Sequence, residues 1–191
     1  MLEQLSTIDT RLFLFLNGHH SPFWDNVMWY FSGKYTWVWL YALLLAYLVY
    51  LFRWRSLIII LGVVLVVTLA DQISVKLFKE VFERLRPCHN PAISHLVHTV
   101  NDKCGGRFGF VSSHASNTFA VAVYLLLFIR RRWFSIFMVS WALIVSYSRI
   151  YLGVHYPADV VGGAILGTAI GWFIYYLAQL LMPYIYKKSP E

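Results

Sequence analysis

The sequence predicts an all-α integral membrane protein with about five transmembrane helices and N-terminal helices that lie in the membrane interface. Two observations carry this prediction. Hydrophobic residues make up 59% of the 191 residues and charged residues 13%, about half the charged share of a soluble domain. The charges also lie between long uncharged stretches, which a bilayer accepts as spans. This composition excludes a disordered chain, a coiled coil, a collagen-like fibre and an ordinary soluble enzyme.

The N-terminal segment, residues 1–33, differs from the rest of the chain. Its first apolar run is broken at residues 17–22, and the next run is too short to cross a membrane. Trp24, Trp29 and Tyr30 are typical anchors at the boundary between lipid and water. We therefore expect one or two interfacial helices here, at the start of a single domain that covers residues 1–191.

Residues 34–186 form the predicted transmembrane core, and residues 187–191 form a tail. A helix needs about 20 mostly apolar residues to cross the hydrocarbon core. The second of the five candidate spans extends to residue 78 if Asp71 and Lys76 are accommodated. The five uncharged stretches are residues 35–52, 57–70, 115–129, 133–148 and 160–186.

Lys and Arg outnumber Asp and Glu by 16 to 9, a net charge of +7. Because these charges form no dense patch on a polar face, we expect no nucleic-acid partner. Arginines in the short turns at 53–55 and 130–132 place those turns in the cytoplasm. The long loop at 79–114 then faces the periplasm or the outside of a plasma or inner membrane. A raw count of Lys and Arg favours the opposite orientation.

The first group of residues with chemical potential lies where the second span ends. Lys79 and Arg86 are seven residues apart, so on a helix they share a face, and Pro87 then turns the chain. Two fixed cations on one face suit a phosphate group. The alternative is that both are basic residues whose charges reach out of the membrane at a span end.

The second group leads into the third span. Ser112 or Ser113 can cap that helix, and a capped N-terminus presents free N–H groups to an anion. His114 would stand beside the anion. The alternative is an ordinary interfacial histidine.

The third group joins the fourth and fifth spans. Pro157 suits the first turn of a helix, which puts His155 at the helix mouth and Asp159 in its first turn. Asp159 can fix the imidazole tautomer and leave the other nitrogen free to attack. The alternative is an ion pair between Arg149 and Asp159, with His155 as a bystander.

The spacings Lys-x6-Arg-Pro, Ser-x-His and Ser-Arg-x5-His-x3-Asp, in this order, resemble those of the type 2 phosphatidic acid phosphatase superfamily. The resemblance covers about residues 79–159, and the chain is similar in length and span number to small bacterial members. Val111 and Ser113 depart from the usual Pro-Ser-Gly-His motif. The resemblance implies an acid phosphatase/haloperoxidase-like helical core.

The resemblance also implies residue roles. His155 would be the nucleophile that forms a phosphohistidine, Asp159 its orienting partner, and His114 the general acid. The phosphoryl oxygens would be held by Lys79, Arg86, Ser112, Ser113 and Arg149. Positioned cations and N–H groups can neutralise a phosphoryl group without a metal. We therefore predict metal-independent catalysis with no cofactor.

The resemblance implies a lipid phosphate as the substrate. Small bacterial members with outward-facing sites commonly act on undecaprenyl pyrophosphate, so this lipid is the first substrate prediction. Phosphatidylglycerol phosphate, phosphatidic acid and lipid A phosphates are the alternatives, and so is transfer of the phosphoryl group to a lipid acceptor. A transporter or lipid-binding protein without catalysis is the hypothesis from another class. It is disfavoured because the sequence has no inverted repeat and no broken spans.

Two further features complete the predictions. Cys88 and Cys104 lie in the long loop, where a disulfide or two free thiols are both compatible with the sequence. Glycines at 163, 167 and 171 form a stripe along the fifth span. Close packing within one chain is the favoured interpretation of this stripe, and a homodimer seam is the alternative.

Overall fold

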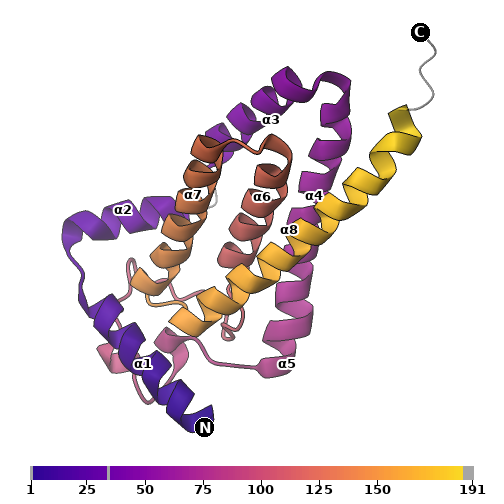
Figure 1. The fold of residues 1–191 in the computed structure, drawn as a ribbon. Helices are drawn as coiled ribbons and strands as arrows, with labels where there is room; N and C mark the ends of the chain where they lie inside the picture. The colour runs from indigo at the N-terminus through magenta and orange to yellow at the C-terminus, as the bar shows by residue number, and fades with distance from the viewer. Residues whose placement is uncertain (1, 34, 187–191) are drawn as a thin grey trace.

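The computed structural model describes residues 2–33 and 35–186, and within these residues it is helical with no strand. Two helices open the chain, and five of the helices that follow form a bundle (Figure 1). The predicted tail at 187–191 lies outside the described residues. The helices are α1 (Leu2–Gly18), α2 (Pro22–Ser32), α3 (Val38–Phe52), α4 (Ser56–Ile73), the short α5 (Glu80–Phe82), α6 (Ser113–Ile129), α7 (Arg132–Tyr151) and α8 (Pro157–Tyr186).

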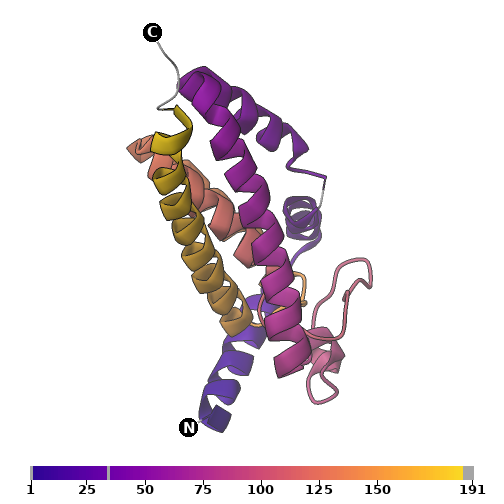
Figure 2. The ribbon, with the colours of Figure 1, turned by 90° about the vertical axis from the view of Figure 1, so that its right-hand side faces the viewer.

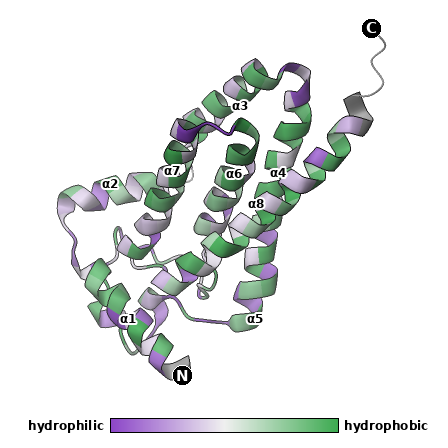
Figure 3. Ribbon diagram, in the orientation of Figure 1, coloured by the Kyte–Doolittle hydropathy of each residue, from purple (hydrophilic) through white to green (hydrophobic). Residues whose placement is uncertain are grey.

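The five bundle helices coincide with the five predicted spans. Apolar residues cover their lengths, and polar residues gather at their ends and in the loops (Figure 3). Three stretches are long and apolar enough to cross a membrane: 38–82, 132–151 and 157–183, while α6 is shorter. The first of them turns back at Arg53–Arg55, so it contributes both α3 and α4 (Figure 1). The exact number of membrane crossings stays a prediction.

Helix α4 is prolonged toward the loop that follows it. A π-helical segment, Ser74–Lys79, continues α4 directly into α5. The chain then leaves the helix at Glu83, which has a left-handed backbone conformation (φ 44°). Residues 84–112 form the long loop, with only short 3-10 turns at Pro87–His89 and Ser94–Leu96. In Figure 2 this loop lies at the same end of the bundle as α1.

Helix α6 is the centre of the bundle and is packed most closely by α8. A Cβ atom added to Gly163 or Gly171 would lie 2.5 Å from a carbonyl oxygen of α6, and one added to Gly167 would collide with the carbonyl oxygen of Ser116. The glycine stripe therefore lets two backbones approach within one chain, as the favoured interpretation expected. A homodimer stays a prediction, without this stripe to support it.

We predict that Gly167→Val destabilises the protein, because the added side chain must push α8 away from α6. Overpacking of this kind costs about 1–3 kcal/mol. Thermal unfolding of the purified variant in detergent should show a lower Tm than the wild type. Ala169→Val is the matched control, because Ala169 is exposed on the same helix. Equal Tm values for the wild type and Gly167→Val would contradict this packing.

The N-terminal segment forms two helices, and both are joined to the rest of the fold. Asn17, 1% exposed, donates from Nδ2 to the carbonyl oxygens of His98 (3.0 Å) and Tyr151 (2.8 Å). It also accepts from the backbone N–H of His98 (2.8 Å). Helix α2 begins at a capping residue, Ser21. These contacts dock the segment onto the long loop and the end of α7.

Candidate active site

The three predicted groups meet at one end of the bundle. Lys79 ends the π-helical segment after α4, and Arg86 follows in the long loop. His114 lies in the first turn of α6, and Arg149 lies in the last turn of α7. His155 and Asp159 come from the junction of α7 and α8. Residues far apart in the sequence are thus gathered because the helix ends and the loop that carry them lie at the same end of the bundle.

His155 and Asp159 form a buried pair. Their side chains are 2% and 0% exposed, and Nδ1 of His155 lies 3.4 Å from Oδ2 of Asp159. The same carboxylate oxygen accepts from the backbone N–H of Tyr156 (3.0 Å). The backbone N–H of His155 is bonded to the carbonyl oxygen of Arg149 (3.2 Å). Because Nδ1 faces the carboxylate, Nε2 is the nitrogen on the far side of the ring.

Gly109 closes the other side of this pair. Its added Cβ would lie 3.0 Å from Oδ2 of Asp159 and 3.5 Å from Nδ1 of His155. The backbone N–H of Gly109 is held by the carbonyl oxygen of Arg84 (2.8 Å). Only a residue without a side chain lets this loop segment pass so close to His155 and Asp159. Gly109 therefore helps to exclude water from the pair.

Three cations surround the histidine. Lys79 Nζ donates to Ser113 Oγ (2.7 Å), which also bonds Ser74 Oγ (2.7 Å). Arg86, 9% exposed, donates from Nε to the carbonyl oxygen of Phe108 (3.2 Å). Arg149 donates from Nη1 to Ser32 Oγ. Within the described part of the chain, the hydrogen bonds of all three go to neutral oxygens.

This cluster has excess positive charge. Among the side chains that the structure describes, those of residues 4–33 and 35–183, no carboxylate lies within ion-pair distance of Lys79, Arg86 or Arg149. The Nε of Arg149 is buried and has no hydrogen-bond partner in the same part of the chain. Buried cations are normally paired. An anion is therefore the missing partner, and a phosphoryl group has the oxygens to fill this role.

The two serines at the start of α6 have different environments. Ser112 is buried, and its Oγ accepts from the N–H of Ala115 (3.5 Å) as the N-cap. The Ser112 N–H donates to the carbonyl oxygen of Asp159 (2.9 Å), which ties the two helix starts together. Ser113 Oγ is engaged by Lys79. Direct contact of either serine with a phosphate stays a prediction.

The electrostatic environment keeps the candidate nucleophile neutral. Burial lowers the pKa of His155 well below its usual 6.5, and the positive charges of Arg86, Arg149 and Lys79 lower it further. Burial, the same cations and His155 also lower the pKa of His114. A neutral imidazole at His155 is the form that can attack phosphorus.

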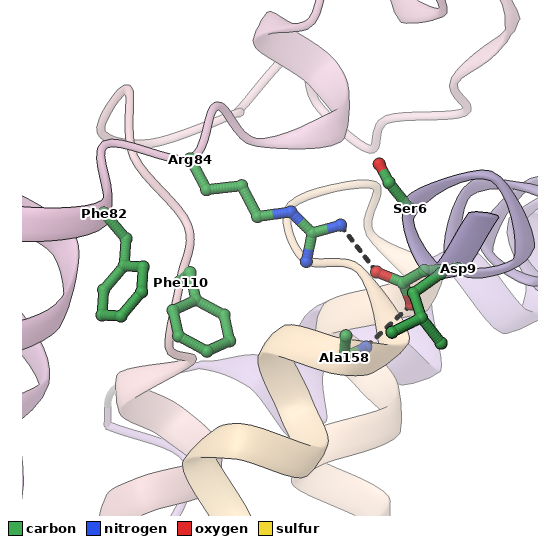
Figure 4. A pocket seen from close by; sticks show the side chains of 7 residues that line it. Ser6, Asp9, Phe82, Arg84, Phe110 and Ala158 are labelled. Atoms are coloured by element: carbon green, nitrogen blue, oxygen red, sulfur yellow. Dashed lines mark hydrogen bonds and ion pairs between the residues drawn. The ribbon is translucent and has the colours of Figure 1, made fainter. Parts of the chain in front are cut away.

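Two residues of this site were missed by the sequence analysis. Arg84 donates to Oδ1 of Asp159 (2.7 Å) and to Oδ2 of Asp9 on α1 (2.6 Å). Figure 4 shows the contact with Asp9. The alternative of an ion pair between Arg149 and Asp159 is wrong, because Arg84 takes that position. Arg84 lies between Lys79 and Arg86 in the sequence, so its charge beside the first motif could have indicated a role at the site. Asp9, 149 residues before its contact Ala158, gives no such signal.

The long loop is tied to the site. Cys88 and Cys104 are joined in a disulfide, with 6.0 Å between their Cα atoms. Arg86 Nη1 donates to the carbonyl oxygen of Cys104 (3.1 Å). The disulfide therefore fixes a segment of the loop against Arg86, one of the phosphate-binding candidates.

Groups of three or more His, Cys, Asp or Glu that could hold a metal are absent from the described residues.

A cavity of about 290 Å³ reaches Arg149 from the side of the loop. Trp29 of α2 and Lys103 of the loop are among the residues that line it, with the Lys103 ammonium 5.5 Å from the indole ring centre. The full lining is Trp29, Ser32, Gly33, Lys103, Cys104, Gly105, Arg149, Leu152 and Val154.

The fold and this cationic histidine site define a membrane phosphatase. The family model for the PAP2 superfamily matches residues 57–183, and the chain belongs to this superfamily. It is a hydrolase that acts on phosphate esters, and its membership confirms the resemblance drawn from the three motifs.

Curated relatives share most of the chain. It is 46% identical over 193 residues to the lipid A 4'-phosphatase of Bacteroides thetaiotaomicron, covering all of this chain and 85% of the relative. It is 34% identical to the lipid A 4'-phosphatase of Porphyromonas gingivalis, covering 98% and 78%. It is 30% identical to the undecaprenyl-diphosphatase of Sulfolobus acidocaldarius, covering 89% and 78%.

Two solved structures share the fold. The PAP2-type phosphatidylglycerolphosphate phosphatase of Bacillus subtilis aligns with a TM-score of 0.71 at 23% identity, covering 93% of this chain and 88% of that one. LpxE of Aquifex aeolicus aligns with a TM-score of 0.65 at 22% identity, covering 87% and 94%. These structures confirm the predicted all-helical membrane phosphatase fold.

Proposed function

We propose that this protein removes the 4'-phosphate from lipid A, at the periplasmic face of an inner membrane. The observation that carries the chemistry is the unpaired cation cluster around His155. Lys79, Arg86 and Arg149 have no carboxylate partner within the described residues, which is the state of a site built for a phosphoryl group. The two relatives with the highest identities given above, both named lipid A 4'-phosphatase, support this substrate.

The positions of His155, Asp159 and the cations support a two-step reaction through a phosphohistidine. Nε2 of His155 attacks phosphorus while Asp159 stabilises the positive charge that develops on the imidazole. The bond to the sugar oxygen breaks, and His114 donates a proton to that leaving oxygen. Water, deprotonated by His114, then attacks the phosphohistidine and releases inorganic phosphate. The three cations and the free N–H groups of α6 stabilise the equatorial oxygens in both steps.

The cavity beside Arg149 supports a sugar head group over an isoprenyl chain. Trp29 and Lys103 line this cavity together with Arg149, and the Lys103 ammonium lies over the indole ring, 5.5 Å from its centre. A phosphorylated sugar can pack against the indole and bond the ammonium, whereas an isoprenyl pyrophosphate brings no ring to this position. Undecaprenyl pyrophosphate, the first prediction from the sequence, is supported only by the less similar relatives.

A substrate panel tests the proposal. The purified protein in detergent with a chelator is given lipid A, undecaprenyl pyrophosphate, phosphatidylglycerol phosphate or phosphatidic acid. We expect the highest kcat/KM for lipid A, and mass spectrometry should place the lost phosphate at the 4' position. Lipid A left intact while undecaprenyl pyrophosphate is hydrolysed would contradict the substrate. Transfer of the phosphate from lipid A to a second lipid, instead of its release into solution, would indicate a phosphotransferase.

The lowered pKa of His155 predicts where activity is lost in acid. His155 must be neutral to attack, and a pKa below 6.5 keeps it neutral down to more acidic pH. The acid limb of kcat/KM should therefore have its midpoint below pH 6.5. The measurement is a pH–rate profile on lipid A. An acid midpoint at or above pH 6.5 would argue against His155 as the titrating base.

A further inference from the structure

We propose that Arg84, held by Asp9 of helix α1, is a positioning residue that fixes Asp159 for its work on His155. This inference rests on the phosphohistidine step of the proposed function. It assigns a catalytic task to α1, which the sequence indicated only as a helix at the membrane interface. Neither Arg84 nor Asp9 belongs to the three motifs that carry the resemblance.

The two oxygens of Asp159 are used separately. Oδ1 accepts from Nη1 of Arg84 at 2.7 Å, and Oδ2 accepts from the N–H of Tyr156 at 3.0 Å. Oδ2 is also the oxygen that faces Nδ1 of His155 at 3.4 Å. The guanidinium therefore determines the rotation of the carboxylate and turns the second oxygen toward the imidazole.

Asp9 fixes the other end of the guanidinium. Its Oδ2 accepts from Nη2 of Arg84 at 2.6 Å, and its Oδ1 accepts from the N–H of Ala158 at 2.9 Å. Asp9 thus binds Arg84 and the first turn of α8, the helix that carries Asp159. The Asp9 side chain is only 10% exposed. Figure 4 shows Arg84 and Ala158 both joined to Asp9, and from Arg84 the contacts continue through Asp159 to His155.

A third contact prevents Arg84 from joining the phosphate-binding cations. The Arg84 guanidinium carbon lies 4.1 Å from the ring centre of Tyr156, and the Tyr156 hydroxyl accepts from Asn90 Nδ2 (3.0 Å). The guanidinium is stacked on this ring while it binds both carboxylates. Arg84 therefore acts through Asp159, and its loss should lower kcat rather than weaken binding of the phosphate.

Chemical rescue provides a sharp test because Arg84 and Asp9 line a cavity of about 280 Å³. Arg84→Ala leaves space into which guanidinium ion can diffuse from that cavity. Loss of a group that orients a catalytic partner typically costs about 10–100-fold. We expect a fall of this size in kcat for Arg84→Ala, with KM and inhibition by inorganic phosphate unchanged, and partial recovery on addition of guanidinium chloride at low concentration.

Matched variants keep the test decisive. Arg11→Ala, an exposed arginine on α1, should match the wild type and show no response to guanidinium. Asp9→Asn should lower kcat less than Arg84→Ala, and the double variant should lose less than the product of the two effects because the residues act as a unit. Arg84→Lys should retain part of the activity, since an ammonium can still reach one carboxylate.

The outcomes separate this inference from the proposed function. If Arg84→Ala and Asp9→Asn both keep the wild-type kcat, the inference is wrong. It is also wrong if Arg84→Ala loses kcat, still binds phosphate normally and gains nothing from guanidinium. If the wild type releases no phosphate from lipid A but does so from another panel lipid, the substrate proposal fails, and the variants are compared on that lipid instead.

Discussion

Replacement of His155 by glutamine is expected to abolish phosphate release. Glutamine keeps a polar side chain of similar reach but has no nucleophilic ring nitrogen, so the covalent step cannot occur. Removal of a catalytic nucleophile costs about 10⁵-fold or more in kcat. Initial rates on the preferred lipid, measured over long incubations with excess enzyme, give the comparison.

The control for this variant is retained binding of the product. Lys79, Arg86 and Arg149 are untouched, so inorganic phosphate should still raise the thermal stability of His155→Gln. A variant that binds phosphate and still turns over at a rate near that of the wild type would show that His155 is not the nucleophile.

The second large effect is expected for Asp159→Asn. The amide can present its N–H to Nδ1 of His155 and favour the wrong tautomer. In the histidine–aspartate pair of the serine protease triad, the same change lowers kcat by about 10⁴-fold. It also leaves Arg84 with one carboxylate instead of two. We expect kcat to fall by about 10³–10⁴-fold with a small change in KM. The measurement is steady-state kinetics on the preferred lipid.

Asp159→Glu serves as the matched control, since it keeps the charge but misplaces it. Its activity should lie between those of the wild type and Asp159→Asn. Wild-type kcat in Asp159→Asn would contradict the orienting role of this carboxylate and, with it, the positioning role of Arg84.

The helix arrangement could be predicted because hydrophobic stretches define the bundle almost directly. Each candidate residue was charged or polar at the end of such a stretch, where its cost demands a reason. His155, Asp159 and Arg149 were placed together because Pro157 starts a helix at a known distance from them. Their grouping with Lys79, Arg86 and His114 needed only that alternate helix ends lie on one side of the membrane.

The rest depended on long-range contacts that no local pattern encodes. Arg84 meets Asp9 and Asp159, each 75 residues away in the sequence, so neither pairing is visible as a motif. The broken apolar run and the aromatic anchors of residues 1–33 indicate interfacial helices, whereas the contacts of α1 with the loop and α8 decide its place. Ser32 as the partner of Arg149 was hidden for the same reason.

The substrate lay beyond the motifs as well. The three groups recognise a phosphoryl group, which every candidate lipid carries. We expect the cavity beside Arg149 to distinguish one lipid head group from another. Two of its lining residues, Trp29 and Lys103, come from α2 and the long loop. These segments lie outside the three motifs, so motif spacing gives no information about them.

Trapping of the covalent intermediate tests the central claim most directly. Purified protein is mixed briefly with lipid A labelled with ³²P at the 4' position and quenched in alkali, where phosphohistidine survives. The account predicts label on the wild-type protein, stable to alkali and lost in acid, which peptide mapping places on His155. Rapid release of labelled phosphate with no label on the protein at any quench time would contradict it.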